Sequence, residues 1–127
     1  MGEIRKYDIT VTVQPQYIAD QSDEAAGRYV FAYRVTIVNT GSVGAKLLSR
    51  HWVIDDQVGD KQEVRGQGVI GEQPALAPGQ AFEYVSGVAI AAPVGTMHGS
   101  YQFVADDGTT FDAPIAPFVL SIPRVLH

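Results

Sequence analysis

The sequence predicts an all-β protein, an immunoglobulin- or fibronectin-III-like sandwich of seven or eight antiparallel strands. Two observations predict this class. Apolar and polar residues alternate over short segments, which places successive side chains on opposite faces of a sheet. Glycine, proline, asparagine and aspartate separate these segments about every 8–15 residues, as in sandwiches and barrels. No long stretch shows the three- and four-residue apolar spacing of a helix.

Each strand follows from its own pattern. In segments 8–14 and 28–39 the alternation is uninterrupted, and their β-branched residues disfavour a helix. Turn residues delimit the later strands, which we expect at about 46–56, 61–70, 80–90 and 97–105. The turns themselves are predicted at Val58-Gly59-Asp60, Leu76-Ala77-Pro78-Gly79, Pro93-Val94-Gly95 and Asp107-Gly108.

The last predicted strand carries Pro114, Pro117 and Pro123. Proline has no N–H to donate to a neighbouring strand, so this segment is expected at a sheet edge or in an irregular strand.

Trp52, in the third predicted strand, occupies the place where such sandwiches often keep a core tryptophan. Strict alternation puts Arg50 on the same face as Trp52 and Ile54, which would bury an arginine. Either a β-bulge shifts the register or Arg50 lies at the rim of the sandwich, and we favour the bulge.

Length and composition exclude several classes of protein. The 127 residues suit a single domain over 1–127. The absence of cysteine excludes disulfides, thiolate metal sites and cysteine nucleophiles. The charged N-terminal segment lacks a signal-peptide core, and no apolar run approaches the about 20 residues that span a bilayer. We therefore expect a cytoplasmic protein without membrane association. The net charge of −5 disfavours nucleic-acid binding.

Gly66-Gln67-Gly68-Val69-Ile70-Gly71 matches the G-x-G-x-x-G pattern of dinucleotide-binding loops. In those loops a helix follows and its N-terminus holds the pyrophosphate. Here Glu72-Gln73-Pro74 follows, and no helix can grow there. We favour a structural interpretation, in which the glycines permit a bulge, a tight bend or close packing. Pyrophosphate binding, with Arg65 adding one charge, is the alternative.

No catalytic constellation emerges, so we expect no enzyme, no cofactor and no metal site. Ser49, His51 and Asp55 share one strand face, but residues two apart on a strand are about 6.5–7 Å apart and cannot converge. His51 and His98 lie on strands that could be neighbours. No third ligand is implied, and His127 is terminal.

The segment Ser49-Arg50-His51-Trp52 is the strongest candidate for a binding surface, because arginine and tryptophan are enriched in interface hot spots. Together with the glycine loop it gives the candidate ligand- or partner-binding residues Arg50, His51, Arg65, Gly66, Gly68, Gly71 and Glu72.

Several motifs carry a family resemblance over residues 4–122. They are Asn39-x-Gly41, Leu47-Leu48-Ser49-Arg50-His51-Trp52, Gly66-x-Gly68-Val69-x-Gly71-Glu72-Gln73-Pro74, Leu76-x-Pro78-Gly79, Tyr84-x-Ser86-Gly87 and Pro93-x-Gly95-x-Met97-x-Gly99-x-Tyr101. In this order they resemble the ApaG family.

The resemblance implies a fibronectin-III-like sandwich, an association with cobalt and magnesium homeostasis, and a role in protein–protein interaction. It also implies the suggested pyrophosphate role for Gly66, Gly68 and Gly71. We therefore expect a non-catalytic binding module with an unidentified protein partner. The alternatives are a nucleotide or pyrophosphate binder using 66–71 and a direct divalent-metal binder. Free edge strands would also allow a homodimer.

Overall fold

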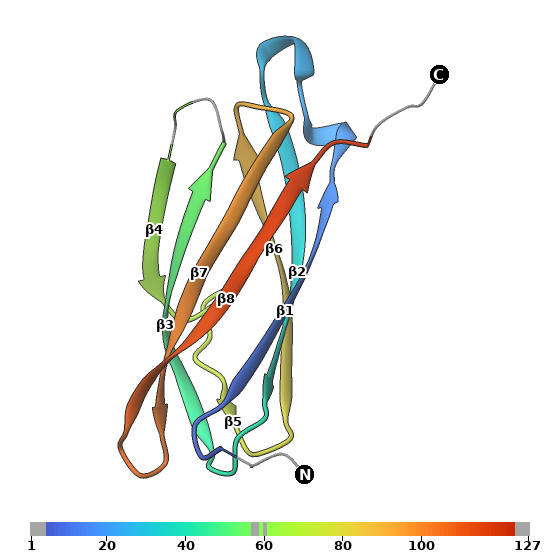
Figure 1. Ribbon diagram of the computed structural model, residues 1–127. Coiled ribbons are helices and arrows are strands. Elements are labelled where there is room, and N and C mark those ends of the chain that lie inside the picture. The colour runs from blue at the N-terminus through green and yellow to red at the C-terminus, as the bar shows by residue number, and fades with distance from the viewer. Residues whose placement is uncertain (1–4, 57–58, 60, 124–127) are drawn as a thin grey trace.

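Two antiparallel sheets face each other in the computed structural model, which describes residues 5–56, 59 and 61–123 (Figure 1). One sheet has the strand order β1-β2-β6, and the other has the order β4-β3-β7-β8 with β5 paired to β3. The strands within these residues are β1 Ile9–Tyr17, β2 Tyr29–Asn39, β3 Ala45–Asp55, β4 Lys61–Gln67, β5 Ala75–Leu76, β6 Ala81–Ile90, β7 Val94–Ala105 and β8 Thr110–Ser121. The predicted sandwich of seven or eight strands is confirmed.

The connection from β1 to β2 contains two short 3₁₀ turns, η1 Ala19–Gln21 and η2 Glu24–Ala26. Asp23 caps the second turn, because its carboxylate accepts a hydrogen bond from the Ala26 N–H at 3.2 Å. Among the described residues, no helix has the length and apolar character needed to cross a membrane.

Alternation puts the apolar face of each sheet into the core. In β2, the side chains of Phe31, Val35 and Ile37 are buried. These residues are separated by even numbers of positions, so their side chains lie on the same face of the sheet. Trp52 is also buried, and the rings of Tyr33, Tyr101 and Phe118 surround its indole. The predicted core role of Trp52 is confirmed.

A β-bulge interrupts β3, where its register with β7 shifts between Leu47 and Ser49. The predicted bulge is therefore present, but it precedes Arg50 and does not turn Arg50 away from Trp52. Arg50 stays on the inner face of the sheet, half-buried at the rim, while Leu47 before the bulge is fully buried. The bulge thus lets Leu47 and Trp52 both face the core although they are an odd number of residues apart.

The two lateral edges of the sandwich differ. On one side β1 and β8 approach each other (Figure 1). The rings of Tyr7 and Phe111 are in contact there. On the other side β4 and β6 are the edge strands, and they are not hydrogen-bonded to each other. The side between β4 and β6 is therefore where the inner faces of the sheets can be reached.

The predicted turn Leu76-Ala77-Pro78-Gly79 connects β5 to β6, as expected. The turn predicted at Pro93-Val94-Gly95 is wrong in its position, because the bend ends at Pro93 and β7 already begins at Val94. Asp107 and Gly108 join β7 to β8, with Gly108 at φ 88°. The proline-bearing strand β8 is an edge strand, and its register with β7 shifts between Met97 and Gly99, as predicted. Of the turn Val58-Gly59-Asp60, Val58 and Asp60 lie outside the described residues.

Candidate functional site

A cleft of about 270 Å³ opens between the edge strands β4 and β6 and reaches down to the core. We call it the edge cleft. Its floor and walls come from both sheets: Tyr33, Arg50, Trp52, Ile54, Gln62, Val64, Ser86, Gly87, Val88, Ala89 and Met97.

Among the described residues that line the edge cleft, Arg50 is the one with a basic side chain. Its Nη1 donates hydrogen bonds to the carbonyl oxygens of Gln67 at 3.1 Å and Gly68 at 2.8 Å. The guanidinium lies directly against Gly66, where a Cβ would be 2.8 Å from the Cζ atom of Arg50. Glycine at position 66 is therefore required for this placement of the guanidinium.

No carboxylate in the described part of the chain pairs with Arg50. The ion pairs found there join Arg34 to Glu83, and His51 and Arg65 to Glu63. Arg50 therefore brings a positive charge into the cleft, and no described acidic residue forms an ion pair with it.

Two buried tyrosines lie close to the Arg50 charge. The hydroxyls of Tyr84 on β6 and Tyr101 on β7 are hydrogen-bonded to each other across the two sheets. Burial raises the pKa of Tyr84 to about 12, and it raises the pKa of Tyr101 as well. The positive charge of Arg50 acts in the opposite direction on both pKa values, which reflects its proximity to the two hydroxyls.

The glycine loop is a two-residue hairpin. The N–H of Val69 donates to the carbonyl of Glu72 at 2.8 Å, and the N–H of Glu72 donates back to Val69 at 2.9 Å. Ile70 and Gly71 between them have φ values of 44° and 79°, the signature of a type I′ turn. Gly68, at φ 63°, lies so close to the Glu72 carbonyl that a Cβ would overlap it. These glycines permit a tight bend, as the structural interpretation predicted.

The same loop differs from a dinucleotide-binding loop in two ways. The chain continues through Pro74 into the short strand β5, so no helix follows the motif. The N–H groups of Gly68, Val69 and Glu72 donate to carbonyls of the protein, that of Gly68 to Leu48 at 2.8 Å. These three amides are therefore already engaged within the fold.

His51 and Arg65 lie on the opposite face of the sheet from Arg50. They are direct cross-strand partners, and both contact the carboxylate of Glu63, with His51 Nε2 at 3.1 Å and Arg65 Nη2 at 3.5 Å. The hydrogen bond from His51 holds the pKa of Glu63 below its usual value. The structure thus divides the candidate residues into two groups, because neighbours on a strand point to opposite faces.

The inner group comprises Arg50, Gly66 and Gly68, with Gly71 and Glu72 in the adjoining hairpin. The outer group is His51 and Arg65. His98 lies on β7, next to the strand of His51, as expected. Among the described residues no three or more His, Cys, Asp or Glu side chains are placed to hold a metal ion. His127 lies outside the described residues.

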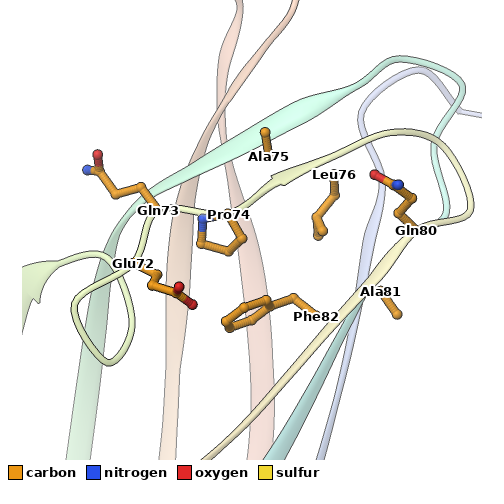
Figure 2. Close-up of a pocket in the computed structure, with 8 residues that line it drawn as sticks. All are labelled: Glu72, Gln73, Pro74, Ala75, Leu76, Gln80, Ala81 and Phe82. Atoms are coloured by element: carbon orange, nitrogen blue, oxygen red, sulfur yellow. The ribbon is translucent and has the colours of Figure 1, made fainter.

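A second hollow, of about 540 Å³, lies beyond the hairpin, between β5 and the start of β6. Figure 2 shows Glu72, Pro74 and Phe82 directed toward it. Most of the residues that line it are exposed, so it is a shallow depression of the surface rather than a route into the core. The edge cleft is the stronger candidate site, because it reaches the buried Trp52 and Met97 and holds the half-buried guanidinium of Arg50 between the two sheets.

Sequence reasoning missed the β6 wall of the edge cleft. Ser86 and Val88 line it, opposite Val64 of β4. The alternation of 80–90 places Ser86 in phase with Tyr84 and Val88, so a polar residue on the inner face was the available signal.

Comparison with known proteins then identifies the family. The ApaG domain matches residues 19–105 of this chain. The chain belongs to the ApaG family. It is 61% identical over 127 residues to Protein ApaG of Nitrosospira multiformis and 60% identical over 127 residues to Protein ApaG of Thiobacillus denitrificans. In both comparisons 100% of each chain is covered.

A crystal structure of an ApaA protein from Bordetella pertussis is similar in fold, with a TM-score of 0.94 and 51% identity. The similarity covers 97% of this chain and 100% of that one. The resemblance of the sequence motifs to the ApaG family is therefore confirmed over the full fold.

Proposed function

We propose that this ApaG-family chain is a non-catalytic protein-binding module that takes an extended segment of its partner as an additional strand on β6. The observation that carries the proposal is the unpaired outer edge of β6 beside the edge cleft. An unpaired edge offers a row of N–H and C=O groups to which another chain can hydrogen-bond.

β6 is long and regular enough to serve as such a template. It runs ten residues, Ala81–Ile90, and its register with β2 continues without a bulge. In the described part of the chain, the backbone of 81–90 hydrogen-bonds to β2 alone. Its other edge is therefore available over its whole length.

The other edge strands carry features that discourage pairing. Pro15 interrupts β1, and Pro114 and Pro117 interrupt β8. The short strand β4 presents charged side chains at Lys61, Glu63 and Arg65. By contrast, β6 has no proline.

The single charged residue of β6, Glu83, is paired with Arg34 at 3.0 Å. The exposed face of β6 also carries Val85, which is 54% exposed. β6 is therefore the least protected edge of the sandwich and the one that fits a partner strand.

Side chains of an added strand would point alternately to the outer surface and toward the edge cleft. Main-chain hydrogen bonds would then supply affinity, and the cleft would supply selectivity for the partner sequence. We place this module in the cytoplasm, in keeping with a chain without cysteine. The partner would serve cobalt and magnesium homeostasis, the process that the family resemblance implies.

The test combines capture from cytosolic extract with amide hydrogen exchange on the captured complex. Binding should protect amides of 81–90 more than those of any other strand. Val85→Lys should weaken capture by about tenfold or more, because an edge lysine opposes strand addition. Val119→Lys on β8 is the matched control, since Val119 is 56% exposed, and it should leave capture unchanged.

Protection centred on another strand, no captured protein, or equal effects of the two lysine variants would each contradict the proposal. Sedimentation of the chain alone provides a further check. A dimer that Val85→Lys dissociates would show that β6 pairs with a second copy instead of a partner.

A further inference from the structure

We propose that Arg50 in the edge cleft is the anchor for a carboxylate that sits next to an apolar group on the bound segment. This inference rests on the proposed function and names the chemistry of the partner. The carboxylate could be a chain terminus beside an apolar side chain or an acidic side chain beside an apolar one.

The charge of Arg50 favours an anionic ligand. Arg50 is half-buried between the sheets, and a charge removed from water is costly unless it is paired. Both of its hydrogen bonds come from Nη1 and go to neutral carbonyls. No buried side-chain nitrogen of the described residues lacks a partner, so the remaining nitrogens of Arg50 reach solvent. They are available to a ligand oxygen.

Apolar side chains surround the charge of Arg50 in the edge cleft. The walls include Trp52, Val64, Val88 and Met97, so an apolar group bound there would leave water. Val64 is 38% exposed although it faces the inner side of the sheet. A ligand that filled the cleft would cover it.

The combination of one guanidinium with apolar walls favours a carboxylate over a phosphate. A carboxylate carries one charge and matches the planar fork of arginine through two parallel hydrogen bonds. A phosphate carries more charge, and among the described residues that line the cleft there is no second cation to balance it. Ser86, on the β6 wall, adds one hydroxyl that can donate to the same ligand.

The guanidinium of Arg50 is preorganised by the glycine loop. The carbonyls of Gln67 and Gly68 hold Nη1, and the guanidinium lies against Gly66 in the space that a Cβ would take. An arginine fixed in this way loses little side-chain freedom when a ligand binds. The hairpin at 68–72 therefore positions the anchor rather than contacting the ligand.

The experiment titrates the chain with 3-phenylpropionate and, in parallel, with the uncharged 3-phenylpropionamide. Trp52 fluorescence and the Arg50 Nε–Hε NMR signal report binding in the cleft. We expect saturable binding of the acid in the millimolar range and binding of the amide at least about tenfold weaker. Equal binding of acid and amide, or no binding of either, would overturn the proposal.

Variants test the residue. Arg50→Gln should abolish the preference for the acid, while Lys46→Gln, which removes one positive charge from an exposed site on the same strand, should keep it. Thermal unfolding of each variant confirms that it is folded. If Arg50→Gln does not fold, Gly66→Ala displaces the guanidinium without changing the net charge, and it should weaken acid binding by a similar factor.

Peptides separate the two sources of the carboxylate. Phe-ended tripeptides with a free or an amidated C-terminus test a chain end, and an amidated peptide with internal Phe-Glu tests an acidic side chain. If Arg50→Gln retains partner capture and β6 protection, strand docking stands and the carboxylate anchor is wrong. If the acid binds at Arg50 but no protein is captured, the anchor stands and the proposed function is wrong.

Discussion

Gly99 lies opposite Trp52 in the pairing of β3 with β7, and a Cβ at this position would overlap the carbonyl oxygen of His51. The overlap is with backbone in the centre of a sheet, which cannot move aside cheaply. The requirement comes from contact rather than from a left-handed backbone conformation, because Gly99 is not among the residues with positive φ.

Gly99→Ala should therefore lower the free energy of unfolding by about 1–3 kcal/mol, as overpacking of a core does. Gly87→Ala is the matched control, since its Cβ would meet the Phe31 carbonyl oxygen at an ordinary 3.6 Å. Urea denaturation of both variants measures the difference. Equal losses in the two variants would show that the close approach at Gly99 carries no special cost.

The buried tyrosine pair predicts how stability depends on alkaline pH. Burial raises the pKa of Tyr84 from 10.0 to about 12, and it raises that of Tyr101 further. Above pH 10 the unfolded chain therefore releases protons that the folded chain keeps. The free energy of unfolding should fall with rising pH, by roughly 1.4 kcal/mol per pH unit for each tyrosine.

Denaturation measured from pH 9 to about 12 tests this slope. Tyr84→Phe removes one of the two groups, so its stability should fall about half as steeply over the same range. If the free energy of unfolding falls equally steeply with pH in the unsubstituted chain and in Tyr84→Phe, the tyrosine pair does not control alkaline unfolding.

At the scale of the element, the hairpin at 68–72 holds an unfavourable residue. Ile70 is β-branched, 59% exposed and at φ 44°, a backbone conformation that such residues rarely adopt. The neighbouring Val69 is buried in the core and so fixes the hairpin in place. Packing of Val69 and the hydrogen bonds of the turn therefore outweigh the local preference of Ile70.

Ile70→Asn should stabilise the protein by roughly 1 kcal/mol, because Asn-Gly is the preferred sequence for a type I′ turn. Gly71→Ala, at φ 79°, should destabilise it. Thermal and urea denaturation compare the two variants. A loss of stability in Ile70→Asn would show that the exposed isoleucine makes contacts that offset its strain.

The strands themselves show what a sequence pattern can and cannot predict. Alternation located β2 and β6 closely, because it depends only on which side chains face water. It placed the end of the fourth strand too late, at residue 70, whereas β4 ends at Gln67. Gly68 and Ile70 have positive φ, and that turn is set by hydrogen bonds rather than by polarity.

At the scale of the whole molecule, the functional proposal depends on how the edges of the sandwich are arranged. β1 and β8 approach each other on one side, while β4 and β6 leave the edge cleft open on the other. Residues distant in the sequence, such as Arg50 and Ser86, therefore meet in one cleft. Arg50 lies on β3 and Ser86 on β6, which belong to different sheets, so the packing of the two sheets brings these residues together.

The candidate site was predicted in part for the same reason. The sequence indicated Arg50 and the glycine loop, and the contacts of Gly66 and Gly68 with Arg50 bring them together. The sequence pattern also grouped His51 with Arg50 and the glycine loop, although His51 lies on the other face of the sheet beside Glu63. Proximity along a strand is not proximity in space, because adjacent side chains point in opposite directions.

The sequence alone determined the all-β class, the turns at 76–79 and 107–108, and the core tryptophan, since each depends on local polarity and backbone preference. The tertiary structure decided which strands lie at the edges and what faces Arg50. Those features depend on contacts between residues far apart in the chain, which no local pattern encodes. The charge of Arg50 next to Val64 and Ser86 is visible only once the two sheets are packed.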